Sequence, residues 1–139
     1  SSSSAAADVY KRQILGTVVA GDKRGRQLGF PTANLRLHHE LSPPRGVYAC
    51  MIKINGGDAL LAGAINLGIR PSFDNAEPSI EVHLIDFDRD LYDKTLEVFF
   101  LEKLRDERKF DGVDDLRRQI TLDISSAKLI CEQFISSKS

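Results

Sequence analysis

The stretch Gly46-Val-Tyr-Ala-Cys-Met-Ile-Lys-Ile54, followed by Asn55-Gly-Gly-Asp58, decides the fold of this chain. Apolar, β-branched and aromatic residues dominate its first part, a composition typical of a buried strand. The two prolines of Ser42-Pro-Pro-Arg45 mark where that strand begins, because proline does not fit inside a sheet ladder. Asn55 to Asp58 predicts a hairpin turn, since these residue types tolerate positive φ. We therefore expect a hairpin that runs antiparallel into a strand over Ala59 to Leu67.

Other segments repeat the strand pattern. Ile14 to Ala20 is rich in β-branched and apolar residues, and Ile80 to Asp86 alternates between apolar and polar residues. Lys94 to Leu101 predicts another strand, which should pair with the one that ends at Asp86. Between the strands, Gly68 to Ser79 contains two prolines and a glycine and predicts a long loop.

The pattern changes at Asp111, which predicts the N-cap of a helix. From Val113 onward, apolar side chains recur every three or four residues and form one helical stripe. The stripe consists of Leu116, Ile120, Ile124, Ala127, Cys131 and Phe134. Asp114 and Asp115 fall in the first turn, where the helix dipole favours negative charge.

Five or six short strands before one amphipathic helix favour an all-β fold, a closed antiparallel barrel with the helix packed on its side. Closure removes the exposed edges of a small sheet. Strands and helices do not alternate along the chain, which argues against a parallel nucleotide-binding sheet.

Size and charge narrow the possible functions. With 139 residues and 15.4 kDa, the chain is long enough for one domain with a core. Its 19 basic and 20 acidic residues leave a net charge of −1. The chain therefore lacks the excess of positive charge that is typical of a general nucleic-acid binder. Cys50 and Cys131 lie far apart without a C-x-x-C spacing, so we expect two buried thiols and neither a zinc site nor a disulfide.

The ends and the hydropathy give the remaining expectations. No apolar stretch reaches the length of a membrane span, and no signal peptide is visible. We therefore expect a soluble cytoplasmic protein without membrane contacts, and an organellar location is the alternative. Ser1 to Val9 resembles a linker or a cloning remnant, and the domain is expected over Tyr10 to Ser139.

A glycine-rich basic loop, Gly21-Asp-Lys-Arg-Gly-Arg-Gln-Leu-Gly29, runs into Phe30-Pro-Thr-Ala-Asn34. Residues two apart in an extended segment point the same way, so Thr32 and Asn34 can offer two oxygens to one ion. Mg²⁺ accepts such hard neutral oxygens when phosphates complete its shell. The segment is a candidate phosphate and metal cradle, although Pro-Thr-Ala-Asn also fits a plain strand start.

Glu81 is the carboxylate best placed to serve as a base. It shares a face with His83, opposite the apolar residues of its strand, so it can project from the barrel. Transfer of phosphate to an alcohol commonly needs such a proton acceptor. The same alternation also fits a solvated strand glutamate. Neither a G-x-x-x-x-G-K-[ST] loop nor the protein-kinase signatures occur, so phosphoryl transfer here requires another phosphate cradle.

The charged segment Leu104-Arg-Asp-Glu-Arg-Lys-Phe110 connects the last strand to the helix. It fits a solvated connection. It also fits a flap in which Arg105 and Phe110 reach a planar aromatic ligand by hydrogen bonding and stacking.

Taken together, these motifs resemble riboflavin kinase, and the resemblance runs from about Ile14 to Phe134. It rests on Gly21 to Asn34 with its Pro-Thr-Ala-Asn, Gly46-Val-Tyr48, Asn66-Leu-Gly-Ile-Arg-Pro-Ser-Phe73, Glu81-Val-His83, Asp86-Phe-Asp88, Leu91-Tyr92, Leu104-Arg-Asp-Glu107 and Lys109-Phe-Asp111. These motifs are similar to those of the bacterial type of riboflavin kinase, which forms the C-terminal half of bifunctional FAD synthetase. The resemblance implies a six-stranded antiparallel Greek-key barrel with a C-terminal helix. It further implies transfer of phosphate from MgATP to the 5′-hydroxyl of riboflavin, giving FMN and ADP.

The resemblance also implies roles for individual residues. Thr32 and Asn34 would hold the metal and the phosphates, and Glu81 would be the base on the ribityl hydroxyl. The remaining residues would line the nucleotide side of the loop (Gly21, Arg26), the adenine (Leu84, Tyr92), and the isoalloxazine and FMN phosphate (Arg105, Arg108, Phe110). Mg²⁺ is the expected metal, with Zn²⁺ and Mn²⁺ left open.

Alternatives remain at this point. The FAD-forming step of the bifunctional proteins belongs to an N-terminal FMN adenylyltransferase domain with an H-x-G-H type motif, which is absent here. We therefore expect a chain that forms FMN only, either as part of a longer parent or as a stand-alone relative. A non-catalytic flavin- or nucleotide-binding barrel and a kinase for another small alcohol are the competing hypotheses.

Overall fold

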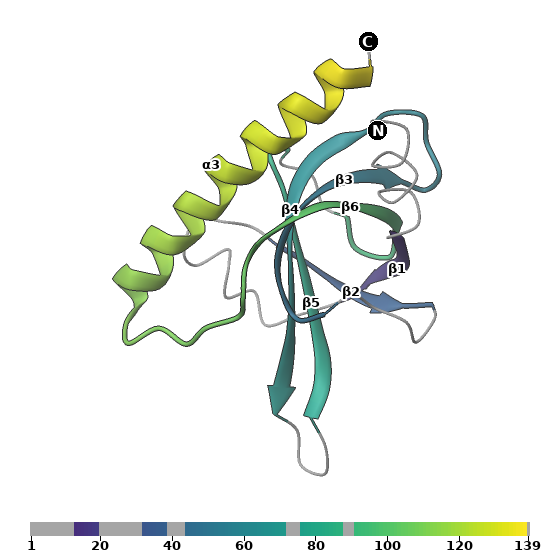
Figure 1. Ribbon diagram of the computed structural model, residues 1–139. Helices are drawn as coiled ribbons and strands as arrows, with labels where there is room; N and C mark the ends of the chain where they lie inside the picture. Colours follow the sequence, from purple (N-terminus) through teal and green to yellow (C-terminus); the bar gives the residue numbers. More distant parts are fainter. Residues whose placement is uncertain (1–12, 20–31, 39–43, 72–75, 88–90, 139) are drawn as a thin grey trace.

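The computed structural model describes residues 13–19, 32–38, 44–71, 76–87 and 91–138. Within these residues, six strands form a closed antiparallel barrel in the order β1-β2-β5-β4-β3-β6, and one helix follows them (Figure 1). The elements are β1 (Gln13–Val19), β2 (Ala33–Leu37), β3 (Gly46–Ile54), β4 (Leu61–Pro71), β5 (Ala76–Leu84), β6 (Thr95–Arg105) and α3 (Val113–Lys138). The predicted barrel with a C-terminal helix is confirmed. The predicted pairing of the Lys94 to Leu101 strand with the strand that ends at Asp86 is wrong, because β6 pairs with β1 and β3, whereas β5 pairs with β2 and β4.

The predicted hairpin is the β3–β4 unit. Its ladder runs from Gly46 opposite Leu67 to Ile52 opposite Leu61. Asn55 and Gly56 both have positive φ, 52° and 72°, as the turn requires. The second strand begins at Leu61, slightly later than predicted.

The predicted loop over Gly68 to Ser79 is wrong. β4 continues to Pro71 and β5 begins at Ala76, and the two strands stay paired out to Pro71 opposite Ala76. They leave the barrel as a two-stranded arm (Figure 1). In the described residues β2 pairs with β5 only at Val82 and Glu81, so the outer part of β5 is an edge. Prolines are tolerated on an edge, because their missing N–H breaks no ladder bond there.

Two smaller predictions at the last connection also need correction. The first helical bond joins the N–H of Leu116 to the carbonyl of Gly112 at 3.2 Å, so the N-cap is Gly112 and not Asp111. β6 continues to Arg105, so the connection to the helix begins at Asp106, later than the predicted Leu104. The acidic first turn of α3, with Asp114 and Asp115, is as predicted.

The core has two parts on opposite sides of the barrel wall. Alternate strand residues fill the interior, among them Ile52, Ile65 and Val82, each at most 1% exposed. On the outside, α3 covers β3, β4 and β6 through the predicted apolar stripe (Figure 1). Ala127 packs with Ala49 and Ala64. The helix is thereby fixed against the barrel, and with it any side chain that it presents to the strands.

Both cysteines are buried free thiols, as predicted. Cys50 belongs to the interior core and Cys131 to the outer cluster under α3, and the Cys131 thiol donates to the Cys50 carbonyl at 3.3 Å. Burial raises the pKa of both thiols, so they stay protonated. In the described part of the chain, no helix is both long and apolar enough to span a membrane.

Candidate active site

A row of polar side chains crosses the outer surface of the barrel. Asn34 of β2 lies directly opposite Glu81 of β5, and Glu81 lies directly opposite Asn66 of β4. Residues paired in this way point to the same face, with Cβ atoms about 4.5–5.5 Å apart. The neighbours Leu35 and Val82 are buried in the interior, so the row points outward. The Glu81 carboxylate thus lies between two carboxamides, and its predicted outward direction is confirmed.

The same row continues toward the helix. Asn66 is paired with Val47 of β3, and Val47 with Arg105 at the end of β6. The ladder shifts register between Val47 and Tyr48, beside this point. Because neighbouring strands lie about 4.8 Å apart, Glu81 and Arg105 are roughly 14 Å apart along the row. The predicted metal ligand, the predicted base and the start of the predicted flap therefore share one outer face.

Thr32 and Asn34 are the predicted metal and phosphate ligands. Thr32 is half-buried immediately before β2, and Asn34 is half-buried within it. Hydroxyl and carboxamide oxygens are hard neutral ligands, which fit Mg²⁺ held mainly by nucleotide phosphates. No group of three or more His, Cys, Asp or Glu side chains suited to a metal occurs among the residues described. The donor set of this segment therefore fits a metal that arrives with ATP.

Residues 106–110, here called the flap, form the first part of the connection between β6 and α3. Phe110 is half-buried and contacts two guanidinium groups, with the Cζ of Arg105 5.5 Å and the Cζ of Arg108 4.7 Å from its ring centre. Arginine stacks favourably on an aromatic face. The structure thus brings together the three residues predicted to contact the flavin.

Other contacts hold the flap near the strands. Lys103 pairs with Asp106, and this hydrogen bond raises the pKa of Lys103 and lowers the pKa of Asp106. Both side chains are well exposed, so the pair adds little stability. The Glu107 carboxylate lies so close to Gly68 of β4 that a Cβ at this position would collide with it. The flap therefore rests on the barrel beside the polar row.

The residues predicted around the nucleotide are less fully placed. Leu84 is 5% exposed and packs in the barrel interior, while Tyr92 is 61% exposed in the connection between β5 and β6. Gly21 and Arg26 lie outside the described residues. The roles of all four residues toward ATP stay predictions.

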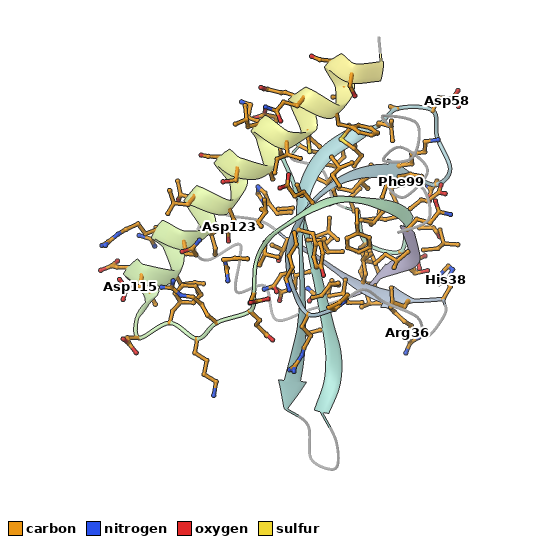
Figure 2. All side chains as sticks on the ribbon, in the orientation of Figure 1. Arg36, His38, Asp58, Phe99, Asp115 and Asp123 are labelled. Carbon is orange, nitrogen blue, oxygen red and sulfur yellow. The ribbon has the colours of Figure 1, made fainter. Side chains whose placement is uncertain are left out.

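Two polar residues of this region are absent from the predicted site. Asn66 stands inside the Asn66 to Phe73 motif, but only the strand register places it beside Glu81. Asp123 lies on the barrel side of α3 (Figure 2) and is 7% exposed. Its sequence signal is a carboxylate four residues before Ala127, inside the apolar stripe. Such a position is unusual for an acid without a partner.

The family follows from comparison with known proteins. The family model for riboflavin kinase matches residues 9–131. The chain belongs to the riboflavin kinase family. Similar proteins include the bifunctional riboflavin kinase/FMN adenylyltransferase of Haemophilus influenzae, 43% identical over 116 residues, which are 84% of this chain and 37% of that protein. The protein of the same name from Bacillus subtilis is 42% identical over 118 residues, 82% of this chain and 37% of that protein. The chain thus spans little more than a third of the curated relatives that it matches.

A solved structure supports the fold of this riboflavin kinase family member. A crystal structure described as a macrolide-efflux protein from Streptococcus pneumoniae superposes with a TM-score of 0.74 at 38% identity. The superposed region covers 80% of this chain and 36% of the other chain. That description concerns the other protein, and the shared property here is the barrel with its helix.

Proposed function

We propose that this chain is a riboflavin kinase that transfers the γ-phosphate of ATP to the 5′-hydroxyl of riboflavin, giving FMN and ADP. The family match over residues 9–131 supports the reaction class. The observation that carries the proposal is the direct pairing of Asn34 with Glu81 on the outer face of the barrel. It sets a phosphate and metal ligand beside a carboxylate, as in-line transfer to an alcohol requires.

On the phosphate side, Thr32 and Asn34 would hold Mg²⁺ together with the phosphates of ATP. Bound there, the metal supplies charge neutralisation of the β- and γ-phosphates. The two side chains would fix the position of that end of the nucleotide. Gly21 and Arg26 would line the loop that precedes them, and Leu84 and Tyr92 the adenine.

On the acceptor side, Glu81 would receive the proton of the 5′-hydroxyl as its oxygen forms the new bond to phosphorus and the bond to ADP breaks. Because Asn34 and Glu81 are paired, they would keep the acceptor oxygen close to the γ-phosphate. Arg105, Arg108 and Phe110 would lie on the flavin side, where a planar ring and an anionic product need stacking and cationic partners.

The relatives are named for two activities, riboflavin kinase and FMN adenylyltransferase. The proposal assigns to this chain the first of them. FMN made here would be the substrate of the second, on a further domain of a longer parent.

Chromatographic separation of flavins after incubation with riboflavin, ATP and Mg²⁺ tests the activity. Wild-type chain should form FMN and ADP in equal amounts. Glu81→Gln keeps the shape of the side chain and removes the base, so FMN formation should fall about 10²- to 10⁴-fold. Riboflavin and ADP binding, followed by flavin fluorescence and calorimetry, should persist.

Glu97→Gln is the matched control, because Glu97 is also a half-buried strand glutamate and lies on β6. It should keep wild-type turnover. Unchanged turnover in Glu81→Gln would rule out this residue as the base. ATP-independent riboflavin binding with no FMN would instead support the non-catalytic barrel.

A further inference from the structure

Among the residues whose burial the structure describes, Asp123 is the only buried charged side chain, and it faces β6 from α3 (Figure 2). Its carboxylate accepts from Nε of Arg105 at 3.1 Å and 3.0 Å, and from Nη2 of Arg105 at 2.9 Å. Nε2 of Gln119, one turn earlier on the helix, donates to the same carboxylate at 2.9 Å. The group is therefore a side-on Arg–carboxylate pair with an additional amide donor.

The pair lies where the flap begins. Arg105 is the last residue of β6, and its Nη1 donates to the carbonyl of Asp106, the first flap residue, at 3.1 Å. The guanidinium also lies over the ring of Phe110, the last flap residue. One arginine thus contacts both ends of the flap, and Asp123 fixes that arginine.

The hydrogen bonds leave Arg105 little capacity for a substrate. Three of its five N–H groups are engaged, and its charge is compensated by Asp123 at a site where both side chains are mostly buried. One N–H group on Nη1 and one on Nη2 are all that remain for a ligand. Arg108, by contrast, is exposed, and its Cζ lies 4.7 Å from the centre of the Phe110 ring.

We propose that Asp123 is a positioning residue of the kinase: it locks Arg105 as the anchor of the flap and so presents Phe110 and Arg108 to the flavin. The proposal rests on the proposed function and divides its flavin side into two roles. Arg108 and Phe110 contact riboflavin or FMN, and Arg105 acts through its position. Loss of the anchor should weaken flavin binding and leave ATP binding unchanged.

The kinetic test compares Asp123→Asn with wild type and with Asp115→Asn, which removes an exposed aspartate from the same helix. Asp123→Asn should lower kcat/KM for riboflavin roughly 10- to 100-fold, mainly through KM, because a displaced contact surface loses substrate alignment. KM for ATP should stay at the wild-type value. Asp123→Glu, which restores the charge, should recover a large part of the loss. Thermal unfolding by circular dichroism identifies a variant that is simply unfolded.

A double variant separates an anchor from a ligand. If Arg105 acts only through the pair, Arg105→Gln combined with Asp123→Asn should be no worse than either change alone. If Arg105 contacts the flavin itself, the two losses in kcat/KM should multiply, which overturns the division of roles. Equal KM for riboflavin in wild type and Asp123→Asn overturns the positioning role.

Limited trypsin digestion without substrates tests the anchor independently of activity. Trypsin cuts after Arg105, Arg108 and Lys109, and mass spectrometry distinguishes these cuts from those elsewhere. Cutting in the flap should be several-fold faster in Asp123→Asn than in wild type or Asp115→Asn. Equal rates overturn the anchor. Failure of wild-type chain to form FMN overturns the proposed function, and the digestion result still decides whether Asp123 holds the flap.

Discussion

At the scale of single residues, function here depends on which neighbours a strand position acquires. Glu81 gains its proposed role because Asn34 and Asn66 flank it across two ladders. Its outward direction follows from alternation along β5, and that part was predictable from the sequence. The identity of its neighbours was not, because a shift of one residue in register would place different side chains beside it.

Asn34→Ala tests the phosphate side of the row. It removes a half-buried carboxamide on the outer face and no core contact, so the free energy of unfolding should change by less than about 1 kcal/mol. FMN formation should fall at least about 100-fold, as expected when one preorganised contact to the reacting phosphate is lost. The rate of FMN formation, measured at saturating ATP and riboflavin, checks this.

Arg36→Ala is the control for that variant. Arg36 lies two residues further along β2, is exposed, and stands with His38 on the side of the barrel away from α3 (Figure 2). Its replacement should leave turnover within about twofold of wild type. Similar losses in both variants would mean that the strand as a whole, and not the Asn34 side chain, supports the reaction.

Asp123 illustrates the limit of sequence reasoning at this scale. Its partner Arg105 belongs to another element, and only packing of α3 on the barrel brings them together. The residue stands in the apolar stripe as an exception, which signals a partner but does not name it. Arg105 was predicted as a flavin contact from its charge, and its pairing with Asp123 was not visible in the sequence.

At the scale of elements, the misplaced boundaries share one physical cause. Two prolines predicted a loop over Gly68 to Ser79, but the edge of a hairpin arm accepts proline. Asp111 predicted the N-cap from side-chain chemistry, yet the backbone bond starts at Gly112. Both errors arise because a local residue preference does not determine where the backbone hydrogen bonds of the folded chain begin and end.

The contact between the flap and β4 gives a prediction for Gly68→Ala. The new Cβ would meet the Glu107 carboxylate, which is the end of a flexible side chain and can move aside. The free energy of unfolding should therefore change by less than about 1 kcal/mol. KM for riboflavin should rise several-fold, because the flap loses the contact between Glu107 and Gly68. Kinetics with varied riboflavin and thermal unfolding give the two readouts.

Gly63→Ala provides the contrast on the same strand. There a Cβ would lie 2.7 Å from the carbonyl of His83, which is backbone and cannot yield without distorting β5. Its main effect should be a loss of stability of roughly 1–3 kcal/mol. A Gly68→Ala variant with wild-type KM for riboflavin would show that the resting place of Glu107 does not matter for flavin binding.

At the scale of the whole molecule, the barrel and helix act as one support for the site. The polar row lies on the barrel wall, and Asp123, which fixes the anchor Arg105, is on α3, so their relative position depends on the seam between helix and strands. Small side chains make that seam close, since Ala127 packs on Ala49 and Ala64 and is fully buried. The apolar stripe correctly predicted which face of α3 packs on the barrel, because apolar periodicity indicates the buried face of a helix.

Ala127→Leu should therefore affect both stability and flavin binding. The larger side chain has no room between Ala49 and Ala64, and overpacking of this kind costs about 1–3 kcal/mol. Asp123 lies one turn earlier, so a displaced helix should also loosen its bond to Arg105 and raise KM for riboflavin more than KM for ATP. Ser126→Leu adds the same side chain at an exposed neighbour and should change neither quantity appreciably. Denaturant unfolding and steady-state kinetics on both variants make the comparison, and equal stability of the two would exclude a close alanine seam as the feature that fixes the helix.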